Sequence, residues 1–126
     1  MCVLALAGCG GDNADESKVR EVATAYLKAI DTKDGSEACS HLTPALRKRF
    51  VHGYGTCPKG VVPIQRLGPG QKGKVDRVEV SGDRASVRAI VTAKGLGGSR
   101  ERLELVRAGG SWKIRRLSSS ALPGPN

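Results

Sequence analysis

Aromatic residues are scarce in this sequence. Its 126 residues include one Trp, one Phe and two Tyr. A protein that stacks successive bases of single-stranded nucleic acid needs several exposed rings, so we do not expect nucleic acid as a partner. The chain is long enough for one domain with a single core and too short for two independent cores.

Metal-binding and nucleotide-binding patterns are also missing. The four cysteines form no Cys-x-x-Cys pair, and the two histidines do not have the spacing of paired ligands, so we expect no metal site. The glycines of residues 68–74 have the spacing of a phosphate-binding loop, but the residues after them alternate like a strand. Such a loop needs a helix at that point. We therefore expect a turn-rich linker there, and no cofactor.

The start of the chain lacks basic residues, since Lys18 is the first. Even so, Leu6-Ala7-Gly8-Cys9 resembles the lipobox of bacterial lipoproteins, in which the cysteine carries diacylglycerol and becomes the new N-terminus after cleavage. The resemblance implies a lipidated Cys9 and an extracytoplasmic protein anchored to the cell membrane. Signal peptides have a basic segment and a longer apolar run. We therefore expect residues 1–8 to be the remnant of a longer signal peptide, followed by a flexible lipidated tether over residues 9–16.

The remaining cysteines form an even number. Cleavage would remove Cys2 and acylation would use Cys9, which leaves Cys39 and Cys57 in an oxidising compartment, where disulfides persist. We expect these two to form a disulfide, worth roughly 3 kcal/mol in the chain-entropy model. The alternative is a cytosolic protein whose thiols are free and whose N-terminus is a short buried strand.

Helical periodicity dominates the first half of the domain. Apolar residues recur at helical spacing over residues 19–30, which predicts an amphipathic helix capped by Asp15 or Ser17. A second helical turn is expected over residues 36–42. The pair Thr43-Pro44 is typical of a cap followed by proline in the first turn, and predicts a third, short helix.

The second half of the domain alternates with a period of two, which predicts strands. Glycine-containing turns are expected at residues 81–83 and 108–110. The sequence thus predicts a four-stranded antiparallel meander with one apolar and one basic face. A disordered tail is expected over residues 118–126. The expected strands are centred on residues 75–80, 85–91, 102–105 and 112–115.

The helix VREVATAYLKAI, the segment ACSHLTPALRKRF and the terminal strand GGSWKIRRL resemble the nuclear transport factor 2-like (cystatin-like) superfamily, in particular its small exported bacterial lipoproteins of unassigned function. The resemblance covers roughly residues 17–117. It implies one α+β domain, in which N-terminal helices pack on a curved four-stranded antiparallel sheet and form a cone with a cavity at its open end. It brings no catalytic motif.

Four residues are candidates for lining that cavity: Tyr26, His41, His52 and Trp112. Either histidine could serve as the base of an enzyme. Because no nucleophile or orienting group accompanies them, we expect no catalytic residues. Tyr26 and Trp112 could equally fill the core, which is the usual place of such side chains.

Positive charge is concentrated in the second part of the chain. Lys and Arg number 21 and Asp and Glu 12, for a net charge of +9. Such a surface attracts anionic lipids, acidic polymers or other anions, and the alternative is a merely solvated face. The candidates for an anion-binding face of the sheet are Arg88, Arg102, Arg107, Lys113 and Arg115.

We therefore expect a membrane-anchored, non-catalytic binding or accessory lipoprotein of the cell envelope. Its partner would be a small hydrophobic ligand or an envelope protein. The alternatives are a small cavity enzyme of the dehydratase or isomerase type and an electrostatic binder of anionic polymers.

Overall fold

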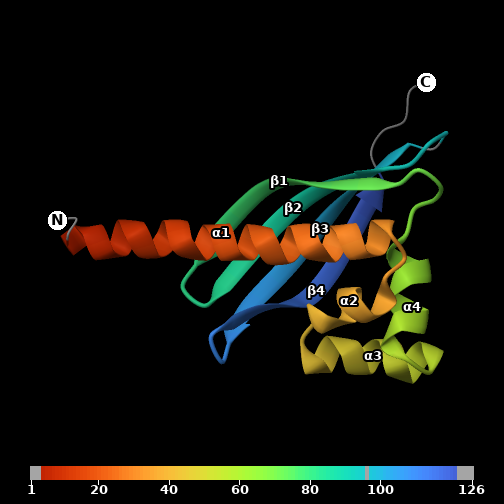
Figure 1. Cartoon of the computed structure of the whole chain (residues 1–126), viewed down its shortest axis with the longest axis horizontal. Coiled ribbons are helices and arrows are strands. Elements are labelled where there is room, and N and C mark those ends of the chain that lie inside the picture. Colours follow the sequence, from red (N-terminus) through yellow and green to blue (C-terminus); the bar gives the residue numbers. More distant parts are fainter. Residues whose placement is uncertain (1–3, 96, 122–126) are drawn as a thin grey trace.

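The computed structural model describes residues 4–95 and 97–121, with side chains described from Ala14 to Ser120. Four helices precede a four-stranded sheet (Figure 1). The helices are α1 (Leu4–Asp31), α2 (Gly35–Ser40), α3 (Pro44–Tyr54) and α4 (Cys57–Gln65). The strands are β1 (Lys72–Ser81), β2 (Arg84–Thr92), β3 (Gly98–Ala108) and β4 (Ser111–Ala121).

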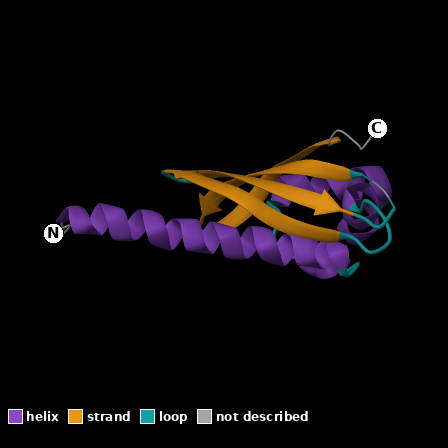
Figure 2. Ribbon diagram, turned by 90° about the horizontal axis from the view of Figure 1, so that it is seen from above, coloured by secondary structure: helices purple, strands orange, loops and turns teal. Residues whose placement is uncertain are grey.

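The four strands form an antiparallel meander in the order β1-β2-β3-β4. Figure 2 shows α1 running along one face of the twisted sheet, while α2, α3 and α4 gather near the end of α1. We call the face toward α1 the inner face and the opposite one the outer face. The predicted α+β fold, with helices packed on a four-stranded antiparallel sheet, is confirmed.

One side of α1 is buried against the inner face. Val19, Ala23, Tyr26, Leu27 and Ile30 recur at helical spacing and are each at most 4% exposed. Alternate residues of the sheet face them, as the period of two requires. These buried sheet residues are Ala85, Val87, Ala89 and Val91 on β2, Leu103 and Leu105 on β3, and Trp112 and Ile114 on β4.

The end of α1 is tied to the start of β1. The carboxylate of Asp31 accepts hydrogen bonds from the side-chain amide of Gln71 (2.8 Å) and the backbone N–H of Gly73 (2.9 Å). A Cβ atom at Gly73 would lie 3.2 Å from Leu27. The β1 backbone therefore passes close over α1, and this approach favours a residue without a side chain.

The segment between α2 and α3 pairs with the edge of the sheet. The N–H of Ile114 donates to His41 O (2.8 Å), and the N–H of Thr43 donates to Ile114 O (2.9 Å). Thr43 also caps α3, because its hydroxyl accepts from Leu46 N–H. These bonds cover part of the outer edge of β4.

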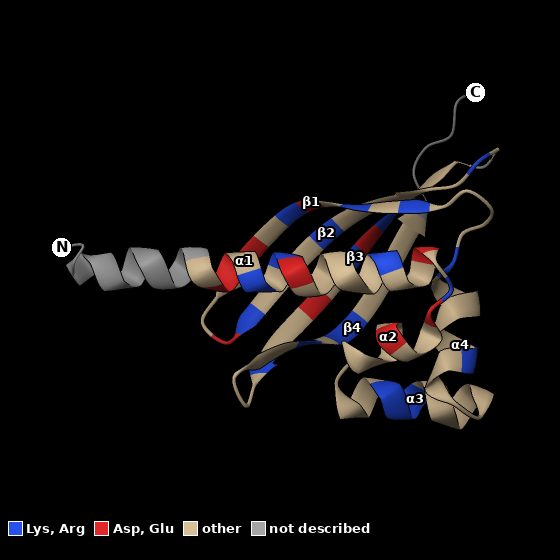
Figure 3. Cartoon of the chain, in the orientation of Figure 1, with Lys and Arg blue, Asp and Glu red and all other residues tan. Residues whose placement is uncertain are grey.

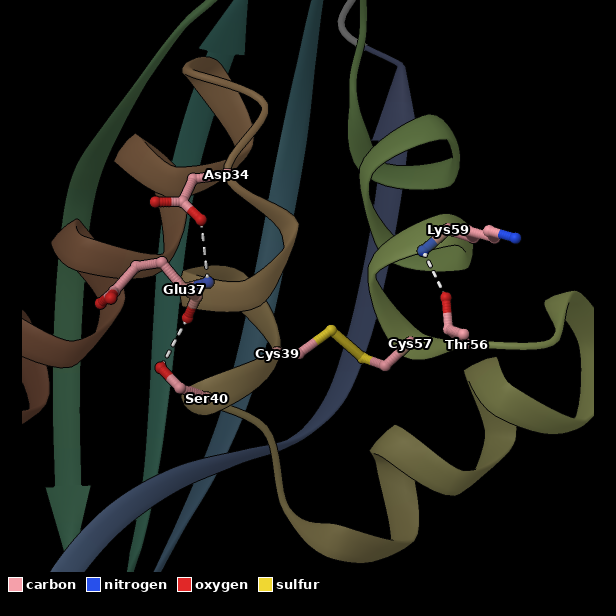
Figure 4. The surroundings of a disulfide bond; sticks show 7 residues. All are labelled: Asp34, Glu37, Cys39, Ser40, Thr56, Cys57 and Lys59. Atoms are coloured by element: carbon pink, nitrogen blue, oxygen red, sulfur yellow. Dashed lines mark hydrogen bonds between the residues drawn. A yellow bond between two sulfur atoms is a disulfide. The ribbon is translucent and has the colours of Figure 1, made fainter.

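Helix α4 was not predicted, because no helix was expected after the one that begins at Thr43-Pro44. Thr56 caps it by accepting from Lys59 N–H, and a proline lies in its first turn, where no N–H partner is needed. The Cys39–Cys57 disulfide is present and joins α2 to α4 (Figure 4). A Cβ atom at Gly60 would lie 2.6 Å from the Tyr54 ring, so α3 and α4 are packed closely together.

Two segments differ from the sequence-based expectation. Residues 10–16, expected as a flexible spacer, belong to α1, which begins at Leu4 and not near Asp15. Residues 118–121, expected in a disordered tail, extend β4, because Ser118 and Ser120 are paired with Arg102 and Arg100 of β3. Pairing with a neighbouring strand thus outweighs their polar composition. The side chain of Cys9 and residues 122–126 lie outside the described part of the chain.

We expect removal of the disulfide in a Cys39→Ser/Cys57→Ser variant to lower the free energy of unfolding by about 2–5 kcal/mol, because the unfolded chain regains the freedom of an 18-residue loop. Urea unfolding followed by circular dichroism measures the difference. Wild-type protein unfolded in the presence of a reductant is the control and should behave like the variant. Equal midpoints for oxidised wild type and variant would contradict the structural role of this bond.

Candidate functional site: an arginine row on the outer face of the sheet

Three arginines lie side by side across the outer face of the sheet. In the strand register Arg77 of β1 is opposite Arg88 of β2, Arg88 is opposite Arg102 of β3, and Arg102 is opposite Ser118 of β4. We call Arg77, Arg88 and Arg102 the arginine row. Their side chains are 61%, 45% and 63% exposed, so each guanidinium is accessible.

The arginine row lies in a depression of about 460 Å³ on this face. Arg100 adds a fourth guanidinium, and it makes no ion pair with any residue that the structure describes. Hydroxyl groups from β2 and β4 complete the lining. The depression is lined by Arg77, Glu79, Ser86, Arg88, Arg100, Arg102, Ser118, Ser119 and Ser120.

Carboxylates flank the arginine row. Glu79 lies 3.0 Å from Arg77, and Asp76 lies 2.8 Å from Arg88. Arg102 is only loosely paired, at 3.8 Å from Glu104, whose other oxygen accepts from Arg115 at 3.0 Å. The flanking acids thus orient the guanidinium groups, while the number of arginines at the depression exceeds that of the acids.

A second, much smaller polar site lies at the inner face. Glu101 of β3 is 7% exposed, and its carboxylate accepts a hydrogen bond from the Ser99 hydroxyl. It borders a cavity of about 80 Å³ together with Arg66, whose buried Nε has no hydrogen-bond partner among the described residues. The hydroxyl of Tyr26 is likewise buried and unpartnered in the described structure.

Burial shifts the titration of both groups at this inner site. Desolvation raises the pKa of Glu101, and the hydrogen bond from Ser99 opposes that shift. Desolvation also raises the pKa of the Tyr26 phenol, and the nearby charge of Glu101 raises it further. Tyr26 therefore stays protonated at physiological pH.

The four expected cavity residues do not converge on one site. Tyr26 and Trp112 are 1% and 4% exposed and belong to the core. His41 is half-buried at the end of α2, where its ring lies 2.7 Å from Glu37 and borders a surface depression beside Trp112. His52 is exposed on α3.

The expected anion-binding residues separate in a similar way. Arg88 and Arg102 belong to the arginine row, and Arg115 is beside it, bonded to Glu104. Lys113 donates to the backbone O of Ser40 at 2.8 Å, at the end of α2.

Arg107 lies on the inner face, unlike the other expected anion-binding residues. It contacts Asp15 of α1 (2.9 Å) and stacks over Trp112 at 5.3 Å. The alternation along β3 places Arg107 on the same side as Leu103 and Leu105. It was predicted on the basic face because it is a basic residue at the end of the strand.

Sequence reasoning missed several residues of both sites. Arg77 and Arg100 fit the period of two along their strands. Only the strand register shows that Arg77 is opposite Arg88. The extension of β4 brings Ser118 to the arginine row. One sequence feature indicates the position of Glu101. The period of two along β3 puts it on the inner face with Leu103 and Leu105.

The side chains that the structure describes contain no group of three His, Cys, Asp or Glu placed to hold a metal ion. In the described helices no stretch is both long and apolar enough to cross a membrane.

The fold is found in solved structures, although no protein-family model and no curated protein matches the chain. A nuclear transport factor 2-like protein of unknown function from Shewanella baltica matches 88% of this chain and 96% of its own, with a TM-score of 0.65 and 12% identity. The chain has the nuclear transport factor 2-like fold.

Two other structures with this fold are of candidate enzymes. A candidate scytalone dehydratase from Novosphingobium aromaticivorans matches 87% of this chain and 85% of its own, with a TM-score of 0.55 and 14% identity. A candidate ketosteroid isomerase from Kribbella flavida matches 89% and 83%, with a TM-score of 0.54 and 17% identity. At these identities the likeness concerns the nuclear transport factor 2-like fold alone.

Replacing Glu101 tests the electrostatics of the inner site. A carboxyl group whose pKa is raised by folding stabilises the protein at low pH, and this contribution is lost as the pH rises through the raised pKa. Glu101→Gln should therefore be more stable than wild type at pH 8, with a difference that shrinks as the pH falls toward about 4. Thermal unfolding from pH 4 to 8 measures this. The exposed Glu79→Gln variant is the control, and an identical pH profile for all three proteins would contradict the effect of burial.

Proposed function

We propose that this protein is a non-catalytic binding protein that holds an anionic ligand on the outer face of its sheet. The observation that carries the proposal is the arginine row in its depression of about 460 Å³. The ligand would carry phosphate or carboxylate groups, because the planar fork of arginine matches both with two parallel hydrogen bonds.

The placement of the arginines supports a binding role. Like charges directly opposite each other on neighbouring strands are destabilising, and here Arg88 has an arginine opposite it on both sides. The flanking ion pairs are exposed, and such pairs contribute between nothing and about 1 kcal/mol. A bound anion would neutralise the row, and the hydroxyls of Ser86 and Ser118 could donate further hydrogen bonds to it.

The inner site favours a binding protein over a cavity enzyme. Pockets that take small molecules measure about 300–1,000 Å³, whereas the cavity beside Glu101 has about 80 Å³. The side chain of Tyr26 is buried in the core, and neither histidine borders the cavity. A dehydratase or isomerase would need room for its substrate between α1 and the sheet.

Membrane anchoring through Cys9 and an extracytoplasmic location complete the proposal. The lipobox-like residues 6–9 support the anchor. The Cys39–Cys57 disulfide supports an oxidising compartment, where such bonds persist. An anion-binding protein held at the membrane in this way would act on ligands of the cell envelope.

The arginine row is tested with inorganic polyphosphate as the probe. Isothermal titration of the full chain should detect binding, and an Arg88→Gln/Arg102→Gln variant should bind roughly tenfold or more weakly, because hydrogen bonds between charged groups are lost. The affinity of the wild type should fall as salt is raised.

A control variant that loses the same number of positive charges distinguishes binding at this site from general electrostatic attraction. Lys48→Gln/Arg49→Gln removes two positive charges from α3, away from the depression. It should keep most of the wild-type affinity. Equal losses in the two variants would mean that the arginine row is no specific site and would refute the proposal.

The lipid anchor is tested by replacing Cys9. In a bacterial host that processes lipoproteins, the wild-type chain behind a lipoprotein signal peptide should incorporate labelled palmitate and stay with membranes washed at high salt, which releases proteins held by charge. Cys9→Ala should lose both, since no other cysteine has the lipobox pattern before it. Cys2→Ala is the matched control and should behave like wild type. Unchanged labelling of Cys9→Ala would rule out the anchor.

A further inference from the structure

Exposed apolar side chains gather on the α3–α4 hairpin, which we define as residues 44–65. The large apolar side chains that are exposed in the described structure are Val51 (46%), Tyr54 (48%) and Ile64 (50%). All three belong to this hairpin. Val51 and Tyr54 are three residues apart on α3 and therefore lie on the same side of that helix.

Two of these side chains border one shallow depression. Tyr54 and Ile64 line a depression of about 230 Å³ whose lining includes the core residues Leu46 and Phe50. The Tyr54 ring packs over Gly60, where any side chain would collide with it. The disulfide at Cys57 fixes α4 to α2. The apolar surface is thus preformed, and little conformational entropy would be lost when it is covered.

The charge of the sequence stretch that contains the hairpin has one sign. Residues 38–75 contain no Asp or Glu, and Figure 3 shows blue but no red on α3 and α4. None of the Lys and Arg residues of this stretch forms an ion pair with a described residue. The basic residues are Arg47, Lys48, Arg49, Lys59, Arg66, Lys72 and Lys74.

We propose that the α3–α4 hairpin docks on the surface of an anionic lipid bilayer, with Val51, Tyr54 and Ile64 inserted at the interface. An apolar surface with a tyrosine, bordered by unpaired Lys and Arg, is the composition that binds anionic membranes. A second copy of the chain is a poorer occupant, because it would bring the same uncompensated charges together. The proposal depends neither on the arginine row nor on lipidation.

Vesicle sedimentation tests the proposal. The full chain carries Cys9→Ser in every sample, so that no acyl chain contributes. Vesicles contain either phosphatidylcholine alone or 30% phosphatidylglycerol. The parent should bind the anionic vesicles at least tenfold more tightly than the neutral ones. Lys48→Gln/Arg49→Gln should weaken that binding roughly tenfold or more, since each basic residue near the surface contributes about fivefold.

A second variant isolates the apolar contribution. Val51→Ser/Tyr54→Ser/Ile64→Ser should also bind anionic vesicles at least tenfold more weakly. Its side chains are about half exposed, so the fold should persist, which thermal unfolding verifies. Arg88→Gln/Arg102→Gln is the control with equal charge loss on the sheet and should bind vesicles within about threefold of the parent.

Three results would overturn the proposal. One is equal binding of the parent to neutral and anionic vesicles, and another is an equal loss in the hairpin and sheet variants. The third is a parent protein that is a dimer in solution and a triple serine variant that is a monomer, with no vesicle binding by either protein. That result would make the surface an interface between copies of the chain. Failure of polyphosphate binding at the arginine row leaves the vesicle result unaffected, so the two proposals fail separately.

Insertion has its own spectroscopic signature. The tryptophan fluorescence of a Tyr54→Trp variant should shift to shorter wavelength when anionic vesicles are added. Brominated acyl chains in those vesicles should quench it. The native Trp112 is 4% exposed in the core and should not respond in the parent. Quenching absent from Tyr54→Trp at saturating lipid would contradict insertion of this surface.

Discussion

The packing of α1 across the inner face of the sheet is the contact on which the rest of the structure depends. Tyr26 and Ile30 fill the space between helix and strands, and small residues such as Ala85 and Ala89 let the helix approach closely. Beside Glu101 the described structure leaves a cavity of about 80 Å³. The two surfaces proposed for binding are on the outside of the molecule.

Those outer surfaces differ in how their charges are compensated. The guanidinium groups of the arginine row have carboxylates beside them, and these carboxylates fix the orientation of the guanidinium groups. A bound anion would have to match that orientation. On the α3–α4 hairpin, the Lys and Arg side chains have no acid within residues 38–75 and share the hairpin with exposed apolar groups. Charges oriented by ion pairs suit a ligand of defined shape, whereas unpaired charges beside apolar groups suit a membrane surface.

Local sequence signals predicted most of the elements. The Thr43-Pro44 cap, the glycine turns and the alternation along β2 and β3 all correspond to contacts within a few residues, which is why a single sequence reveals them. Helix α4 escaped prediction because Gly60 and Pro63 disfavour a helix. It packs against α3, where Gly60 meets the Tyr54 ring, and is bonded through Cys57 to Cys39, 18 residues earlier in the chain.

The candidate sites were harder to predict for the same reason. Arg88 and Arg102 were expected on one face, but their being opposite each other is a property of strand register. Arg107 was expected beside them, although its alternation with Leu105 places it on the inner face. There the contact with Asp15 of α1, far away in sequence, compensates its charge. The exposure of Val51, Tyr54 and Ile64 is a tertiary property as well, since apolar residues at such positions are more often buried.

The two proposed surfaces are maintained by different restraints. Strand pairing sets the arginine row, so it persists as long as the sheet is packed on α1. The hairpin lies near the end of α1 (Figure 1). It is held by the pairing of the preceding α2–α3 segment with Ile114 of β4, by the Cys39–Cys57 bond and by its core residues Leu46, Phe50 and Val61. Reduction removes the covalent link between the hairpin and α2 and leaves the pairing of the strands unchanged. A membrane contact through the hairpin would therefore depend on an oxidising compartment more strongly than an anion contact through the sheet.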